Sequence, residues 1–174
     1  RQRQMCIRDR FPRYLLELAR AWSPNPQRPL WLQEIGAPRT HVPNAIAATF
    51  MTTTMTSLTS TPGLEAITWW CSHDVSHDLL DFPKLEYSLG LFTNDGKPKP
   101  EALALSDILP DLHNAQPQNQ LDEPLEFSAN WDTGQGRSTC SPIGDLFAQW
   151  VDQAERTGKA PRLRRVRTQH CPVP

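Results

Sequence analysis

Apolar residues alternate along the first part of the chain between helical stripes and short uninterrupted runs. An apolar spacing of three and four residues predicts helices, whereas an apolar run of about six residues is typical of a buried parallel strand. These patterns predict helices over residues 11–22, 44–60 and 100–109, and strands over residues 30–35 and 66–71. The expected buried helix faces are Leu15, Leu18, Ala19 and Trp22, then Ala47, Met51, Met55 and Leu58, and then Leu105, Ile108 and Leu109.

This alternation of helix and strand predicts an α/β fold, in which crossover helices join parallel strands. Residues 111–123 are polar and rich in Gln and Asn, which predicts a linker. Beyond it we expect strands over 125–131 and 162–167, and between them a helix over 145–157 that Gly158 ends. The apolar face of that helix consists of Leu146, Phe147, Trp150, Val151 and Ala154. The chain is therefore expected to hold an α/β domain over 11–110 and a small α+β lobe over 124–174.

Composition and length exclude several classes of protein. The chain has 18 Lys and Arg against 19 Asp and Glu, with a pI of about 6.6, which argues against a nucleic-acid partner. No apolar run approaches the roughly 20 residues that a membrane-spanning helix needs, so we expect no membrane partner. At 174 residues the chain is shorter than a complete (β/α)8 barrel, which typically takes about 250 residues. An α/β chain of this length holds at most part of such a barrel.

The cysteines and the first ten residues bear on where the protein occurs. The four cysteines, Cys6, Cys71, Cys140 and Cys171, form no C-x-x-C pair. This spacing favours free thiols in a reducing compartment and a cytoplasmic location. Residues 1–10 are basic, lack the apolar stretch of a secretory signal, and resemble translated sequencing-adapter sequence. We expect this segment to be foreign and the natural protein to begin upstream.

Glu34 stands out because it lies near the end of a strand that is otherwise suited to burial. Burying a carboxylate is costly unless the group is paired or used in function. Side chains alternate along a strand, so Glu34 is expected to share a face with Leu30 and Leu32. If that face lines a barrel, Glu34 lies at the C-terminal mouth, where barrel enzymes carry their active sites. The alternative is a carboxylate just outside the strand that pairs with Arg39.

Two adjacent tryptophans, Trp69 and Trp70, lie at the end of the second predicted strand. Neighbouring residues of a strand point to opposite faces, so one indole packs against helices while the other can reach the barrel mouth. Alternation with Ala66 and Thr68 assigns the inward position to Trp70. An indole beside a carboxylate suits a sugar, whose C–H face stacks on an aromatic ring while its hydroxyls bind polar groups. The alternative is a pair of core tryptophans.

Together these segments resemble the last two βα units of the clan-A glycoside hydrolases, in particular family five and its β-mannosidase and β-mannanase-like members. The resemblance rests on Leu-Gln-Glu-Ile-Gly-Ala-Pro at 32–38 and Ile-Thr-Trp-Trp-Cys-Ser-His-Asp at 67–74. It extends through Glu-Tyr-Ser-Leu-Gly-Leu at 86–91 and Asn-Asp-Gly-Lys-Pro-Lys-Pro at 94–100. The fold it implies is the C-terminal portion of a TIM barrel, followed by the small lobe.

The resemblance implies a retaining hydrolase of β-glycosides, with β-mannosides as the expected substrates and no cofactor or metal. Glu34 matches the nucleophile of the family, and Trp70 matches the aromatic floor of the subsite that holds the sugar under attack. His73 and Asp74 follow the strand and are expected to bind sugar hydroxyls. The acid/base glutamate of the family lies on the fourth barrel strand, and no residue of this chain matches it. We therefore expect a bacterial C-terminal fragment that is inactive alone.

Two other interpretations stay open at this stage. The chain could be a non-catalytic carbohydrate-binding or structural α/β module, in which the tryptophans form a platform and Glu34 has no catalytic role. Separately, His73 and His77 are four residues apart, a spacing that allows a shared metal when the segment is helical. The segment follows a strand and lacks the glutamate of an H-E-x-x-H motif, which favours a loop, either solvated or in contact with sugar, over a metal site.

Overall fold

The computed structural model of the protein describes residues 2–117 and 123–166. It divides into two compact units. Unit 1 contains the described residues up to Pro12 and Pro29–Pro117, and unit 2 contains Arg13–Arg28 together with residues 123–166. Residues 13–28 cluster with the C-terminal part of the chain, whereas the sequence pattern predicts them in the α/β domain over 11–110. In the described ranges no helix is long and apolar enough to cross a membrane.

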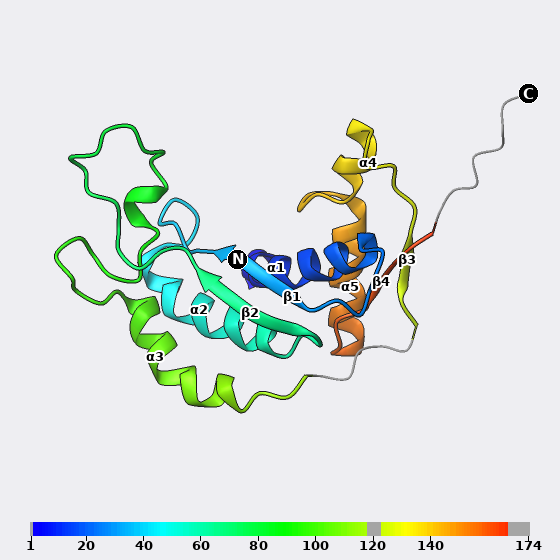
Figure 1. Ribbon diagram of the computed structural model, residues 1–174, viewed down its shortest axis with the longest axis horizontal. Coiled ribbons are helices and arrows are strands. Elements are labelled where there is room, and N and C mark those ends of the chain that lie inside the picture. The colour runs from blue at the N-terminus through cyan, green and yellow to red at the C-terminus, as the bar shows by residue number, and fades with distance from the viewer. Residues whose placement is uncertain (1, 118–122, 167–174) are drawn as a thin grey trace, which may run out of the picture. The chain divides into compact units, whose positions relative to one another are not determined.

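Unit 1 consists of a two-stranded sheet with its helices (Figure 1). The elements are β1 (Leu30–Ile35), α2 (Asn44–Thr59), β2 (Leu64–Trp69), the short 3-10 helix η1 (Glu86–Ser88) and α3 (Pro100–His113). The strands pair in parallel, and α2 connects them and packs against α3. The predicted βαβ alternation is confirmed, and the bounds of β1 are as predicted, whereas β2 begins and ends two residues earlier.

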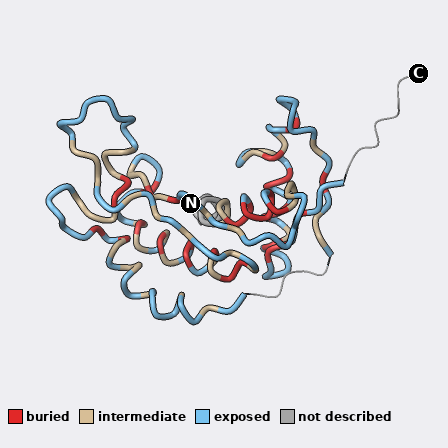
Figure 2. The backbone as a smooth tube through the Cα atoms, in the orientation of Figure 1, coloured by how far each residue is buried: buried red, intermediate tan, exposed pale blue. Residues whose placement is uncertain are grey.

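The inner face of α2 is the apolar stripe predicted from the sequence. Ala47, Met51, Met55 and Leu58 are all buried, as the red turns of Figure 2 indicate. Thr54 is fully buried beside them. Burial of this face compensates for the low helix propensity of the many threonines in the segment, because most helical stability in proteins comes from tertiary packing.

The register of β1 against β2 contains irregularities that change which side chains share a face. Between the Leu32 and Ile35 pairings β1 advances three residues, whereas β2 advances two. Such an extra residue is a β-bulge, which re-aims the side chains that follow it. Trp31 pairs with Ala66 and its indole nitrogen donates to the Thr68 hydroxyl at 2.9 Å. An earlier shift lies between the Leu30 and Trp31 pairings, where β1 advances one residue and β2 two. Trp31 thus lies on the face of Ala66 and Thr68, the face that alternation had assigned to the barrel interior together with Leu30 and Leu32.

The segment between β2 and α3 is held by backbone pairing rather than by a long strand. Residues 71–73 pair with 91–92, since Leu91 donates to the Cys71 carbonyl and Phe92 to that of Ser72. Gly90 is required here, because a Cβ atom would lie 2.2 Å from the backbone of residues 73 and 74. The Trp70–Cys71 peptide is cis. The backbone pairing of residues 71–73 with 91–92 brings the chain that follows β2 next to the segment that leads into α3.

The helix α3 begins at Pro100 as predicted but continues to His113, past Pro110. Its expected inner face is wrong in part, since Leu109 is exposed and Leu105 and Ile108 are only half-buried. The fully buried residue of this helix is Glu101. The first turn of α3 is therefore anchored by a charged side chain rather than by an apolar one.

Unit 2 contains the second part of α1 (Gln2–Trp22), β3 (Leu125–Phe127), α4 (Gly134–Thr139), α5 (Asp145–Thr157) and β4 (Leu163–Arg165). The short strands β3 and β4 pair in parallel. The predicted bounds of α5 are confirmed, and Gly158 ends it with a left-handed φ of 69°. Its five predicted apolar residues are all buried. Patterning did not predict α4.

The core of unit 2 forms where α5 meets α1. The Tyr14 ring lies 4.9 Å from that of Phe147 and 5.8 Å from that of Trp150, centroid to centroid. The predicted stripe of α1 is wrong in part: Leu18 is buried as predicted and Trp22 is half-buried, whereas Leu15 and Ala19 are exposed. Tyr14, which the stripe did not include, is fully buried. Burial of Tyr14 raises the pKa of its hydroxyl, which donates to the Cys140 carbonyl at 3.0 Å.

We predict that Trp150→Ala lowers the free energy of unfolding by about 3–5 kcal/mol, the usual cost of truncating a buried aromatic residue. The Trp150 side chain is fully buried and its indole nitrogen donates to the Pro161 carbonyl at 2.8 Å. The neighbouring exposed Gln149 supplies the control, since Gln149→Ala is expected to change stability by less than about 0.5 kcal/mol. Urea denaturation of both variants measures the difference, and equal midpoints would contradict the packing of Trp150 in this core.

Candidate active site

An open pocket of about 370 Å³ lies where β1 and β2 end in unit 1. Its walls come from the end of β1, from the residue that follows β2, and from the segment around η1. The lining residues are Glu34, Ile35, Gly36, Pro38, Trp70, Leu85, Glu86 and Leu89. The pocket thus combines two carboxylates, one indole and several apolar side chains at the carboxyl ends of parallel strands, where α/β folds commonly bind ligands.

Glu34 is exposed at this pocket and, with Gln33, lies in the bulged stretch of β1 between the Leu32 and Ile35 pairings. The next residue, Ile35, pairs with Trp69 and is buried. Glu34 and Trp70 line the same pocket, and their roles in a site stay predictions. The predicted face shared by Glu34 with Leu30 and Leu32 is not found, because the shift in register intervenes. The alternative pairing with Arg39 is not found either, because the Arg39 guanidinium binds Glu101.

Trp70 and Trp69 point to opposite sides. Trp69 packs against a buried cluster of Ala37, Val42 and Ala47, together with Ile46 and Phe50 of α2. Trp70 is 45% exposed, lines the pocket, and donates its indole N–H to a Glu86 carboxylate oxygen at 3.1 Å. The interpretation of both residues as core tryptophans is therefore wrong for Trp70.

Gly36 allows the end of β1 to approach the residue after β2. A Cβ atom at this position would lie 2.5 Å from the Trp70 carbonyl oxygen and 2.7 Å from the Leu89 side chain. Both distances are shorter than real Cβ contacts, so any side chain here would push Trp70 and Leu89 away from Glu34. The close spacing of the pocket walls thus depends on this glycine.

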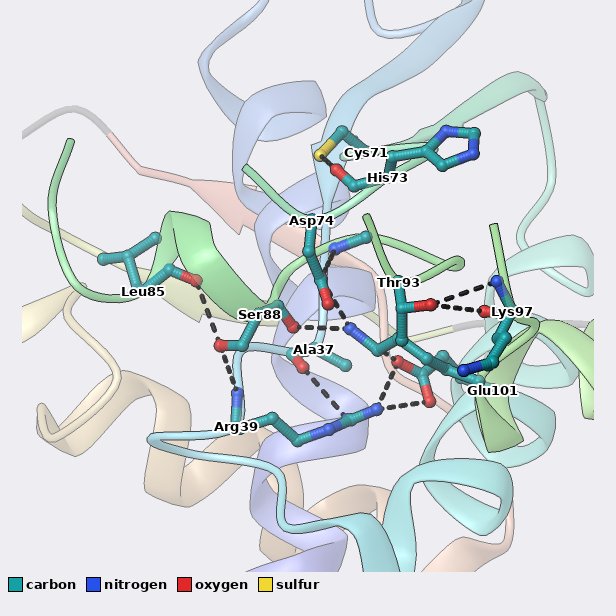
Figure 3. Close-up of polar contacts among 12 residues, drawn as sticks. Ala37, Arg39, Cys71, His73, Asp74, Leu85, Ser88, Thr93, Lys97 and Glu101 are labelled. Atoms are coloured by element: carbon teal, nitrogen blue, oxygen red, sulfur yellow. Dashed lines mark hydrogen bonds and ion pairs between the residues drawn. The ribbon is translucent and has the colours of Figure 1, made fainter. Parts of the chain in front are cut away.

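The structure places His73 and Asp74 outside the residues that line the pocket. The His73 ring is exposed and stacks on Phe92, with 5.4 Å between ring centroids. The Asp74 carboxylate accepts a hydrogen bond from the Lys99 ammonium at 2.7 Å and another from the Gly90 amide at 2.8 Å (Figure 3). Sugar contacts from these two residues therefore stay predictions. In the described part of the chain, no three His, Cys, Asp or Glu side chains gather as a metal site.

A largely buried ion-pair network joins the segments that follow β1 and β2 to the start of α3, and it was not predicted from the sequence. Both carboxylate oxygens of Glu101 accept from one nitrogen of the Arg39 guanidinium, at 2.6 and 2.7 Å. The Lys99 ammonium lies 3.6 Å from Glu101 and also binds Asp74 (Figure 3). We name Arg39, Asp74, Lys99 and Glu101 the ionic network. Glu101 is fully buried and Lys99 is 7% exposed, so these charges depend on one another.

Two signals in the sequence could have indicated this network. Glu101 follows Pro100 in the first turn of a helix, where a carboxylate is favoured by the helix dipole. Lys99 directly precedes that helix, an unfavourable place for a cation unless an opposite charge is close.

The hydrogen bond between Glu86 and Trp70 joins residues 16 positions apart, and no local sequence pattern indicated it. The Cys71 thiol lies nearby, and burial, then the charges of Glu86 and Asp74, raise its pKa.

Comparison with solved structures relates this site to known proteins. The chain is 36% identical to GH5_18 from Streptomyces cattleya, solved in complex with GlcNAc, with a TM-score of 0.82 over 95% of this chain. A glutamate-to-alanine variant of GH5_18 from Bifidobacterium longum subsp. longum, in complex with Manb1-4GlcNAc, is 29% identical with a TM-score of 0.81 over 92%. The resemblance to family-five glycoside hydrolases is confirmed. No protein-family model and no curated protein matches the chain.

The match is to part of a larger protein. The chain covers 39% of the Streptomyces cattleya structure, 38% of the one from Bifidobacterium longum subsp. longum, and 38% of a third GH5_18 from subsp. infantis, which is 32% identical. The mixed α/β fold is consistent with a partial barrel. Because 95% of this chain is aligned with the first structure, the aligned region includes residues of both units.

We predict that Arg39→Ala lowers the free energy of unfolding by about 3 kcal/mol, since removal of one partner leaves the buried Glu101 charge with Lys99 alone. In the Arg39→Ala background, Glu101→Ala should cost far less than it does alone, because the two substitutions remove the same interaction. Lys97→Ala is the matched control, as its ion pair with Asp95 is exposed and should leave the urea midpoint unchanged. Additive effects at Arg39 and Glu101 would contradict the network.

We also predict that Trp69→Ala destabilises the protein whereas Trp70→Ala does not. Trp69 is half-buried against α2, so its truncation is expected to cost about 3 kcal/mol, at the lower end for a buried aromatic residue. The exposed Trp70 ring should contribute much less. Urea denaturation measures both, and the reverse order would mean that the two side chains are exchanged.

Proposed function

We propose that this chain is the C-terminal part of a retaining β-glycoside hydrolase that acts on β-mannosides. The observation that supports the proposal most directly is the pocket that brings Glu34 next to Trp70 at the ends of β1 and β2. These are the residues whose sequence context resembles the nucleophile and the aromatic floor of family five. The 36% identity to a GH5_18 structure supports the same assignment.

In the proposed reaction the Glu34 carboxylate attacks the anomeric carbon of the bound sugar while the glycosidic oxygen leaves. The leaving oxygen takes a proton from a second carboxyl group about 5–5.5 Å away, the spacing of retaining enzymes. A covalent glycosyl ester on Glu34 results, and water then cleaves it with the second group acting as base. The Trp70 ring stacks on the C–H face of the sugar and orients the anomeric carbon towards Glu34.

The acid/base glutamate of this mechanism belongs to the fourth strand of the barrel, which precedes β1 and β2 in the order of the family. No Asp or Glu of this chain is assigned to that role, so the 174-residue chain is proposed to be inactive alone. For the substrate we propose a β-linked mannoside, because a GH5_18 structure similar to this chain binds Manb1-4GlcNAc. That disaccharide is therefore the first substrate to test.

We predict that Glu34→Gln abolishes turnover in the enzyme that includes the upstream barrel, while the fold is unchanged. The amide cannot form the glycosyl ester and does not stabilise the positive charge that develops in the transition state. The expected loss of kcat is several orders of magnitude, and circular dichroism with the urea midpoint checks the fold. Glu65→Gln, at an exposed position of β2 outside the pocket, is the control and should keep normal turnover.

Trapping identifies the nucleophile independently of these rates. A 2-fluoromannoside with a good leaving group should label the peptide that contains Glu34, and mass spectrometry of a digest locates the label. Retention of more than about a tenth of wild-type kcat in Glu34→Gln would rule out Glu34 as nucleophile. If sugar binds but neither turnover nor label is seen in the complete protein, the chain is a carbohydrate-binding module instead.

A further inference from the structure

The pocket holds a second carboxylate, Glu86, which has no role in the proposed reaction. Glu86 begins η1, sixteen residues after Trp70, and accepts the Trp70 indole N–H at 3.1 Å. Both side chains line the same pocket as Glu34. The indole N–H is the one polar group of the Trp70 side chain, so this hydrogen bond restricts how the ring can turn about its attachment.

The backbone of Glu86 is itself held from two sides. Its amide donates to the Pro83 carbonyl at 2.9 Å, and its carbonyl accepts from the Val75 amide at 3.3 Å. The next residue, Tyr87, stacks on His77 with 4.5 Å between ring centroids and donates its hydroxyl to the Leu79 carbonyl. The carboxylate that binds the indole thus projects from an anchored turn.

Exposure of Trp70 makes such a restraint necessary. A buried ring is oriented by the atoms packed around it, as Trp69 is against the Ala37, Val42 and Ala47 cluster. Trp70 is 45% exposed and has packing on fewer sides. An aromatic ring that stacks on a sugar must keep a defined plane, because small misplacements of a substrate are costly for the reaction. A charged acceptor gives a stronger hydrogen bond than a neutral one and suits this purpose.

We propose that Glu86 is a positioning residue, which holds the Trp70 indole in the plane that receives the sugar beside Glu34. This inference rests on the proposed function for the sugar, whereas the Glu86–Trp70 contact stands on the structure alone. Glu86 acts through Trp70 and takes no part in bond making. Replacement of Glu86 should therefore impair sugar binding and turnover when the Trp70 indole is present, and should have little effect when the indole is absent.

The contact is tested first in the 174-residue chain, without any sugar. In a ¹⁵N-labelled sample the six tryptophans report six indole N–H groups, and Trp70→Phe identifies the signal of Trp70. Glu86→Ala should move this signal upfield and speed the exchange of its proton with solvent, whereas Glu86→Gln, which keeps an acceptor oxygen, should preserve most of both. Glu65→Gln is the matched control and should move neither. An unchanged Trp70 signal in Glu86→Ala overturns the proposal, whatever the catalytic residues are.

The consequence for the sugar is tested in the enzyme that includes the upstream barrel, with Manb1-4GlcNAc as substrate. Glu86→Ala should lower kcat/KM by about tenfold to a hundredfold, the scale of a substrate misplaced by about 1 Å. In a Trp70→Phe background, which keeps an aromatic ring but lacks the indole N–H, Glu86→Ala should add little further loss. A full loss in that background would mean that Glu86 contacts the sugar directly and would overturn the positioning role. Failure of Glu34 as nucleophile leaves the indole measurement unaffected, so the two proposals fail separately.

Discussion

The fully buried carboxylate of Glu101 constrains three segments of unit 1 at once. A charge removed from water is tolerated only with cations close by, and here these come from two places, Arg39 after β1 and Lys99 just before α3. Lys99 also binds Asp74, which follows β2. Because each charge depends on the others, the network favours joint assembly of the segment after β1, the segment after β2 and the first turn of α3. The two segments that carry the pocket walls are thereby held at one point.

Within that frame, two backbone features set the geometry of the pocket. The bulge of β1 presents Glu34 at the pocket while Ile35 keeps its pairing with Trp69. Gly36 then lets β1 lie against the Trp70 carbonyl, closer than any other residue would permit. The apolar contacts of Trp69 with α2 serve stability, and the exposed Trp70 serves the proposed sugar site. Adjacent residues of one strand end thus carry separate tasks because strand geometry points them to opposite faces.

Prediction from the sequence succeeded where a single element determines the outcome. The apolar faces of α2 and α5, the bounds of β1 and α5, and the left-handed Gly158 all follow from local spacing and local backbone chemistry. It failed where burial depends on a partner element. In α1 the buried residues include Tyr14 rather than Leu15, because the aromatic side chains of α5 lie against Tyr14. In α3 an ion pair rather than an apolar stripe occupies the buried position.

The sequence by itself determined the βαβ order, the parallel strands and the family resemblance, and it led to the hypothesis that Glu34 and Trp70 belong to one site. These rest on periodicity and on motifs whose residues are close in the chain. Only the tertiary structure decided that Arg39 binds Glu101, that Asp74 binds Lys99 and that Glu86 binds Trp70, since these contacts join residues 16 to 62 positions apart. It also decided that a bulge, not simple alternation, brings Glu34 to the pocket. A bulge is a property of two paired strands, so one strand read alone does not contain it.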